Sequence, residues 1–282
     1  MIYFSVKSLK RCLVFLFIFS FQQELFSQNI FQKKKIFPLG IIDSIYSSEL
    51  SETRILNIYL PEGYSPDSLI KYPVIYLLDG SADEDFIHIA GLIQFLNFPW
   101  IDILPKSILV GIENVDRKRD FTFPTTIEQD KIDFPTTGNS EKFIDFIEKE
   151  LQPFIEKNYN TNDSKMLIGQ SLGGLLATEV LFKKSTLFNQ YVIISPSLWW
   201  DDQSLFTKIN QLKIDKKTDV FIGVGKEGKI MERDAKKIYT SLKKIKNDQL
   251  NVKFEFFPNN NHASILHLAV YKAFENLSPK KK

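Results

Sequence analysis

Short apolar runs alternate with longer helical stretches along most of this 282-residue chain, and this alternation constrains the fold more than any other feature. Apolar runs that are bounded by turn residues are typical of strands covered on both faces. Strands that alternate with helices predict an α/β fold, with a mostly parallel central sheet and helices on both faces. The expected strands are 74–78, 107–112, 165–169, 191–194, 219–224 and 251–257, and the expected helices are 83–96, 140–159, 172–184, 230–245 and 264–277.

Two segments depart from this alternation. The stretches 37–46 and 54–60 are rich in β-branched and aromatic residues, which predicts an antiparallel hairpin at one edge of the sheet. The polar, proline-containing stretch 113–139 is too long for a simple connection and is a candidate substrate-binding loop. A hydrophobic content of 44% is enough for one large core, so we expect a single catalytic domain over 36–277.

The first 27 residues have the layout of a secretory signal peptide. Lys7, Lys10 and Arg11 precede the apolar run 13–21, which is shorter than the roughly 20 residues of a membrane-spanning helix. We therefore expect cleavage near Ser27, export to the periplasm or the extracellular space, and no stable membrane anchor. The single cysteine, Cys12, lies in this segment, so the mature chain would contain no disulfide.

The sequence Gly-Gln-Ser-Leu-Gly at 169–173 matches the G-x-S-x-G pattern of a serine nucleophile. It lies between an expected strand and an expected helix, which is the context that the pattern requires. The flanking glycines let the strand and helix backbones approach each other closely. Ser171 is therefore the candidate nucleophile. The alternative is a glycine-rich helix start with Ser171 as its N-cap.

A serine hydroxyl needs a base to take its proton, and the chain contains only His88, His262 and His267. The chain order of this fold is nucleophile, acid and then histidine, which excludes His88. His262 follows the last expected strand, at the same sheet edge as Ser171. His267 falls within the following helix, so His262 is the preferred base.

The acid that orients the histidine should follow strand 219–224. Glu227 occupies this position, Asp234 on the next helix is its rival, and Glu232 is a weaker choice. A Ser-His dyad without an acid is also open. The oxyanion hole needs two backbone N–H groups, for which Leu172 and Ser81 are the candidates, with Gly80 as the alternative to Ser81.

Several sequence segments together resemble the putative-esterase family of α/β-hydrolases, which includes enterochelin esterases, feruloyl esterases and S-formylglutathione hydrolases. The resemblance spans about 36–277, and Ser-Pro-Ser-Leu-Trp-Trp at 195–200 is most similar to the siderophore esterases. Besides the serine motif, the matching segments are Tyr-Leu-Leu-Asp-Gly at 76–80, Gly-Ile-Glu-Asn at 111–114, Arg117 and Arg119-Asp120.

The resemblance implies an α/β-hydrolase fold and the hydrolysis of small carboxylic esters. It also implies that Arg119, Trp199 and Trp200 lie near the acyl pocket. The position of the acid varies within this family, and some siderophore esterases work with a dyad. The role of Glu227 therefore stays open at this point.

Other functions find less support in the sequence. The pattern Gly-x-Gly-x-x-Gly at 223–228 matches a dinucleotide fingerprint, but the next strand is not followed by the acidic residue that this site needs. The histidines lack metal-ligand spacing, and the net charge of +2 gives no reason to expect a nucleic-acid partner. We expect no cofactor and no metal. An acyltransferase and a non-catalytic binding domain are the competing interpretations.

Overall fold

The computed structural model describes residues 37–278, and from Leu39 onward the chain forms one compact unit. The expected signal peptide at 1–27 lies outside the described residues. Within 37–278, no helix combines the length and the apolar character needed to cross a membrane.

The described chain forms a sheet of eight strands in the order β1-β2-β4-β3-β5-β6-β7-β8. β1 and β2 form the expected antiparallel hairpin at one edge, β2 also pairs antiparallel with β4, and all other pairs are parallel. The prediction of a mostly parallel sheet is confirmed. The strands are β1 (Ile41–Ser47), β2 (Glu52–Tyr59), β3 (Tyr72–Leu77), β4 (Ile108–Ile112), β5 (Thr161–Gln170), β6 (Gln190–Ile194), β7 (Thr218–Gly225) and β8 (Leu250–Phe257).

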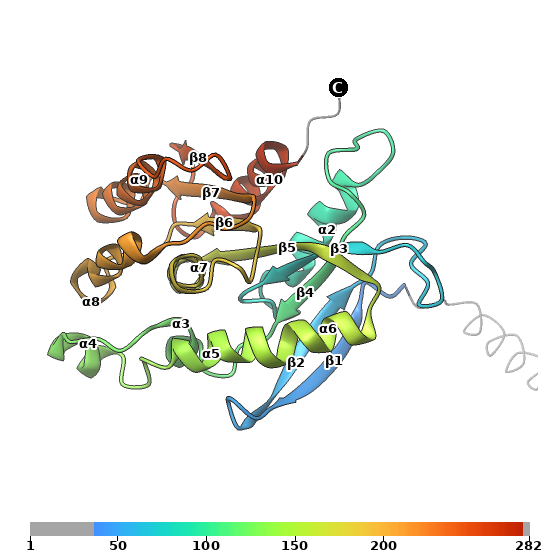
Figure 1. Cartoon of the computed structure of the whole chain (residues 1–282), viewed down its shortest axis with the longest axis horizontal. Helices are drawn as coiled ribbons and strands as arrows, with labels where there is room; N and C mark the ends of the chain where they lie inside the picture. The colour runs from blue at the N-terminus through green and yellow to red at the C-terminus, as the bar shows by residue number, and fades with distance from the viewer. Residues whose placement is uncertain (1–36, 279–282) are drawn as a thin grey trace, which may run out of the picture. The chain divides into compact units, whose positions relative to one another are not determined.

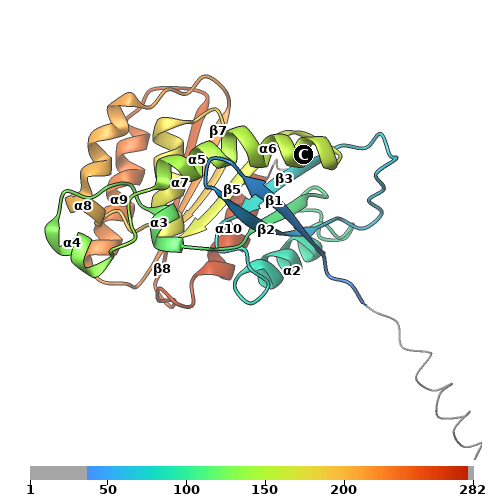
Figure 2. The same ribbon diagram turned by 90° about the horizontal axis from the view of Figure 1, so that it is seen from below.

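Helices cover both faces of the sheet (Figures 1 and 2). Helices α2 (Phe86–Leu96) and α10 (Leu266–Leu277) pack on one face, and α7 (Leu172–Lys183) and α9 (Lys229–Lys243) pack on the other. Side chains of successive strand residues enter opposite cores, as Tyr76 and Leu77 of β3 do. This two-sided burial explains why the inner strands β3, β4, β6 and β7 are mostly apolar.

The expected helix 140–159 contains an irregular turn. It consists of α5 (Ser140–Phe146), a π-helical turn (Ile147–Leu151) and α6 (Gln152–Asn158). Pro153 has no backbone N–H to continue the regular ladder, which is consistent with a widened turn just before it. The whole stretch covers the same sheet face as α7.

The excursion 113–139 folds onto the segment that follows β6. It contains two short helices, α3 (Arg117–Phe121) and α4 (Glu128–Asp133), and it packs against α8 (Trp200–Gln203), which the 3₁₀ helix η2 (Ser204–Gln211) follows. The Asp201 carboxylate accepts hydrogen bonds from the Thr126 N–H and hydroxyl at 2.6 and 2.8 Å. Trp200 Nε1 donates to the Phe123 carbonyl at 2.9 Å. The excursion is therefore an ordered part of the domain.

Candidate active site

Ser171 occupies the sharp turn between β5 and α7. Its backbone has φ 60° and ψ −119°, a conformation that non-glycine residues rarely adopt. A Cβ atom at Gly169 would lie 2.3 Å from the carbonyl oxygen of Gly173, so only glycine allows the strand and helix to approach this closely. The Ser171 N–H donates to the Ile194 carbonyl at 3.0 Å, which ties the turn to the end of β6. The turn leaves the side chain of Ser171 facing a cavity.

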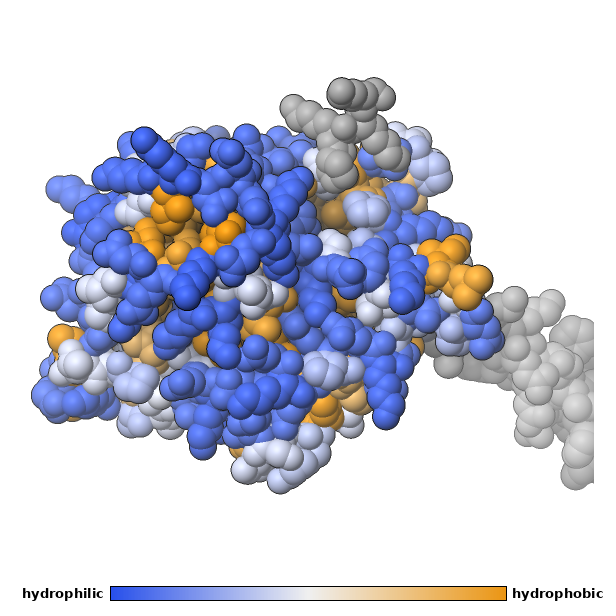
Figure 3. Space-filling view, in the orientation of Figure 1, coloured by the Kyte–Doolittle hydropathy of each residue, from blue (hydrophilic) through white to orange (hydrophobic). Residues whose placement is uncertain are grey.

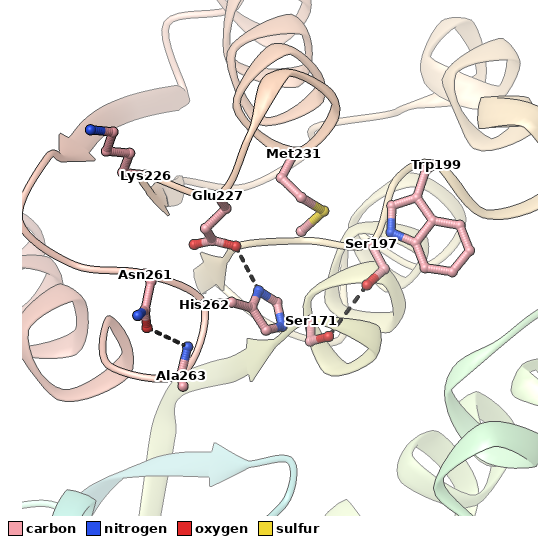
Figure 4. A pocket seen from close by; sticks show the side chains of 9 residues that line it. All are labelled: Ser171, Ser197, Trp199, Lys226, Glu227, Met231, Asn261, His262 and Ala263. Carbon is pink, nitrogen blue, oxygen red and sulfur yellow. Dashed lines mark hydrogen bonds and ion pairs between the residues drawn. The ribbon is translucent and has the colours of Figure 1, made fainter.

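His262 lies on the loop between β8 and α10. Its backbone carbonyl accepts a hydrogen bond of 2.5 Å from Gln170 Nε2, so the residue before the candidate nucleophile holds the histidine loop. The side chain of Asn261 accepts the N–H groups of Ala263 and Ser264, which closes the loop on itself. In Figure 4, the imidazole lies between Glu227 and Ser171, with its second nitrogen facing the serine.

Glu227 lies on the loop after β7 and is hydrogen-bonded to the histidine. Its Oε2 is 2.6 Å from His262 Nδ1, while its Oε1 accepts from Ser195 Oγ at 2.5 Å and from the Gly225 N–H at 2.9 Å. Burial raises the pKa of Glu227, but the hydrogen bonds from these three donors outweigh it and leave the pKa below its usual value. The carboxylate is therefore ionised and both of its oxygens have partners.

The rival acids occupy other positions. Asp234 is buried on α9, where it pairs with Arg233 at 2.8 Å. Glu232 Oε1 accepts the backbone N–H groups of Glu227 and Gly228, both at 3.0 Å. Glu232 therefore holds the loop that carries Glu227 and does not pair with the histidine.

The glycines at 223–228 serve the packing of two loops. A Cβ atom at Gly225 would lie 2.5 Å from the carbonyl oxygen of Asn260. This close approach allows the Lys226 N–H to donate to the same oxygen at 2.7 Å. The resulting contact joins the loop of Glu227 to the loop of His262, so Gly225, at the centre of the pattern, has a structural role that involves no nucleotide.

The other two histidines form a pair of their own. The rings of His88 on α2 and His267 on α10 have centroids 4.9 Å apart, and both residues are exposed. Neither lines the cavity beside Ser171. Among the three histidines, His262 is the one that the fold brings to the serine.

The two expected oxyanion donors lie on two neighbouring turns. Leu172 directly follows Ser171, and Ser81 follows β3, the strand that pairs with β5. Leu172 is the first residue of α7, where backbone N–H groups have no partner within the helix. The Gly80 N–H is already bonded to the Ile112 carbonyl at 3.0 Å, so it is not free to bind an oxyanion. The Gly80 carbonyl accepts from Asn57 Nδ2 at 3.0 Å. Because a trans peptide directs its N–H opposite to its carbonyl, the Ser81 N–H points away from Asn57.

An open cavity of about 620 Å³ lies beside the serine, and loops and helix ends that follow the parallel strands form its walls. Trp199 and Met231 supply apolar surface, while the side chain of Lys226 extends beyond Glu227, with its ammonium directed away from Ser171 and Trp199 (Figure 4). Hydrophobic residues also gather around α7, α8 and α9 on an otherwise largely hydrophilic face (Figure 3). The lining residues are Ser171, Ser197, Trp199, Lys226, Glu227, Met231, Asn261, His262 and Ala263.

The structure separates the two adjacent tryptophans. Trp199 faces the cavity, but Trp200 has only 1% of its surface exposed and packs in the core, where its N–H bonds to Phe123. Phe134 lies against both rings, at centroid distances of 6.4 and 5.8 Å. The excursion 113–139 contributes no residue to the cavity lining and instead packs behind the tryptophan segment.

Arg119 does not lie at the acyl pocket. Its guanidinium pairs with Glu52 at 2.6 Å and with the fully buried Asp120 at 2.8 Å. Residues two apart on a helix point in different directions, and on α3 it is Arg117 that points toward the serine turn. Arg119 therefore joins α3 to β2, and it is not among the residues that line the cavity beside Ser171.

The sequence interpretation missed the role of Ser197. Its hydroxyl oxygen lies 3.4 Å from Ser171 Oγ, and its N–H donates to the Ser171 carbonyl at 3.0 Å. Ser197 lies in Ser-Pro-Ser-Leu-Trp-Trp at 195–200, the segment that resembles the siderophore esterases. Within 37–278, no cluster of His, Cys, Asp or Glu could hold a metal ion.

Comparison with known proteins places the chain in a family. The profile of the family described as "Putative esterase" matches residues 47–265, most of the chain. The chain belongs to this esterase family. Its curated relatives include the ferri-bacillibactin esterase BesA of Bacillus subtilis, 30% identical over 256 residues that cover 80% of this chain and 86% of the relative. The apo-salmochelin esterase of Escherichia coli is 25% identical, over 73% of this chain and 70% of that esterase.

Solved structures agree with this assignment. An IroE-like serine hydrolase from Shewanella oneidensis matches with a TM-score of 0.77 and 33% identity, over 85% of this chain and 80% of that chain. The BES protein from Bacillus cereus matches with a TM-score of 0.78 and 30% identity, over 88% and 98%. These similarities support esterase activity for the family member described here.

Proposed function

We propose that this chain is an exported serine esterase that hydrolyses carboxylic esters through an acyl-enzyme. The observation that carries the proposal is the convergence of Ser171, His262 and Glu227 at one sheet edge, with Glu227 bonded to His262 at 2.6 Å. A non-catalytic binding domain would place no demand on this combination.

The reaction follows from this arrangement in two stages. Ser171 Oγ attacks the ester carbonyl carbon while His262 takes the serine proton, and the oxyanion accepts the N–H groups of Leu172 and Ser81. The carbon–oxygen bond to the alcohol then breaks, and His262 returns the proton to the leaving alcohol. Water, deprotonated by His262, attacks the acyl carbon, the bond from this carbon to Ser171 Oγ breaks, and His262 returns the proton to Oγ as the acid is released. Glu227 stabilises the imidazolium throughout.

Hydrolysis fits the site better than transfer to a bulky acceptor. The side chain of His262 is 46% exposed, so water reaches the base that must activate it. An acyltransferase needs a site that excludes water in favour of another acceptor. The open cavity gives no specific support for that alternative.

The substrate class that we propose is a siderophore or another ester with aromatic acyl groups. Trp199 offers an aromatic wall beside Ser171, which suits an ester with an aromatic acyl group. Two relatives support this choice, and the match to this chain covers most of the length of each. Their names describe them as esterases of ferri-bacillibactin and apo-salmochelin. We also propose export, from the layout of residues 1–27, which would place the enzyme in the periplasm or the extracellular space.

A substrate panel tests the proposal. The purified protein should hydrolyse p-nitrophenyl acetate, an aromatic acyl ester, and a tris-catecholate trilactone with and without Fe³⁺, with the linear products detected by mass spectrometry. Cleavage of p-nitrophenyl acetate without cleavage of the trilactone would refute the siderophore assignment alone. Inactivity toward all esters would refute the esterase assignment.

A further inference from the structure

Arg117 touches both turns that present the oxyanion donors, although it does not line the cavity. Its Nε and Nη2 donate to the two carboxylate oxygens of Asp79 at 2.6 and 2.9 Å. Its Nη2 also donates to the backbone carbonyl of Gln170 at 3.3 Å. Asp79 begins the turn that leads to Ser81, and Gln170 immediately precedes Ser171. One guanidinium thus joins the two turns.

The turn at Asp79 needs such support. Asp79 adopts φ 56°, a left-handed conformation that is unfavourable for a residue with a Cβ atom. Its carboxylate also accepts from Asn114 Nδ2 at 2.7 Å, while the carbonyl of Gly80 is held by Asn57. Hydrogen bonds therefore hold both the side chain of Asp79 and the carbonyl of the peptide that carries the Ser81 N–H.

The helix that carries Arg117 is itself anchored. On its other side, Arg119 pairs with Glu52, and Asp120 pairs with Arg54 of β2. Both Arg54 and Asp120 are fully buried, so this attachment is shielded from solvent. Helix α3 thus connects β2 to the two turns, and Arg117 is the contact at its active-site end.

We propose that Arg117 is a positioning residue that sets the distance between the Ser81 and Leu172 N–H groups. It acts through Asp79 and Gln170, and it does not contact the reacting atoms. Donors that are fixed before the reaction stabilise the oxyanion of the transition state more than the ground-state carbonyl, so the effect falls on kcat. The inference rests on the proposed function, because the two N–H groups have an oxyanion to stabilise only if Ser171 attacks an acyl carbonyl.

Kinetics of Arg117→Ala and Arg117→Lys test this role in the full chain. The substrate is p-nitrophenyl acetate, and the transition-state probe is an aryl boronic acid, whose adduct with Ser171 places an oxygen in the oxyanion hole. Arg117→Ala should lower kcat about 10²-fold, as the loss of one oxyanion donor does, and weaken boronate binding by a similar factor, with KM within about threefold of wild type.

The lysine variant and a control on the same helix sharpen the test. Arg117→Lys should lose about tenfold in kcat, because one ammonium cannot reproduce the bidentate contact with Asp79 and the bond to Gln170. Lys118→Ala removes the same charge from α3 but should match wild type, since its ammonium lies over the Phe134 ring at 5.0 Å. Circular dichroism and the melting temperature establish that each variant is folded. If Arg117→Ala does not fold, Arg117→Lys decides the question.

Two results would overturn the proposal. Unchanged kcat and boronate affinity in a folded Arg117 variant would show that the two turns keep their geometry without Arg117. A raised KM with unchanged kcat would make Arg117 a substrate-binding residue instead. An inactive wild-type protein would refute the proposed function, whereas an active wild type with equally active Arg117 variants would refute only the role of Arg117.

Discussion

The two sides of Ser171 are built in different ways. On one side, Glu227 and His262 lie on short loops that leave the neighbouring parallel strands β7 and β8, and backbone contacts such as the Lys226–Asn260 hydrogen bond join these loops. On the other side, a long excursion leaves β4 and is held to the domain by side-chain contacts, including the pairs of Asp79 with Arg117 and of Thr126 with Asp201.

This difference suggests that the two sides of Ser171 have different roles. The side whose loops are joined by backbone contacts carries Glu227 and His262, the groups that handle the proton. Their geometry must be the same whichever ester is hydrolysed. The side that depends on the excursion supports the oxyanion turn and the wall formed by Trp199. We therefore expect substitutions on the first side to abolish turnover, and substitutions on the second to change its rate moderately, its specificity or the stability of the fold.

Among the residues around the nucleophile, the largest effect should come from the acid. Glu227→Gln removes the charge that orients and stabilises the imidazolium, and kcat should fall by about 10⁴, as the equivalent change does in a serine triad. Asp234→Asn is the matched control and should keep kcat near wild type, because Asp234 pairs with Arg233 instead of His262. If neither change alters kcat by more than about tenfold, the enzyme works with a Ser171-His262 dyad.

Trp199 should affect specificity more than chemistry. Trp199→Ala should lower kcat/KM for an aromatic acyl ester about tenfold, since a well-packed aromatic contact contributes roughly 1 kcal/mol beyond its buried area. The loss for p-nitrophenyl acetate should be smaller, and Trp199→Phe should retain most of the preference. Equal losses for both esters would mean that Trp199 has no role in selecting the acyl group.

Arg119 should matter for stability. Arg119→Ala removes a partner of the buried Asp120, so the melting temperature should fall by several degrees. KM for p-nitrophenyl acetate should stay within about threefold of wild type. A selective rise in KM for aromatic esters, without a change in melting temperature, would restore Arg119 as a substrate-binding residue.

The smallest effect concerns the pH dependence of stability. The pKa of Glu227 is lower in the folded protein, so its contribution is fully present above the unfolded pKa of about 4.3 and is lost as the pH falls through the folded pKa. The difference in melting temperature between wild type and Glu227→Gln should therefore shrink below about pH 4. A constant difference across this range would show that the ionised carboxylate does not stabilise the fold.

The same difference between the two sides of Ser171 explains which parts of the site the sequence could predict. The alternation of strands and helices specifies the sheet, and residues that follow parallel strands must meet at one edge, which placed Ser171, Glu227 and His262. Which way a side chain points on the one-turn helix α3 depends on tertiary partners far along the chain, Asp79 for Arg117 and Glu52 for Arg119. Likewise, the sequence alone does not show that Trp199 lines the cavity while Trp200 is buried in the core. This difference depends on the excursion, whose Phe123 carbonyl accepts the Trp200 N–H.

The identity of the nucleophile is the central claim, and covalent labelling tests it most directly. Incubation of the purified protein with a fluorophosphonate, followed by peptide mapping, should show one modification, at Ser171, because the turn after β5 exposes this hydroxyl to the cavity beside His262. Ser171→Ala should be unlabelled, and its kcat should fall on the order of 10⁶-fold. Labelling at Ser197, or turnover by Ser171→Ala near the wild-type rate, would contradict the account.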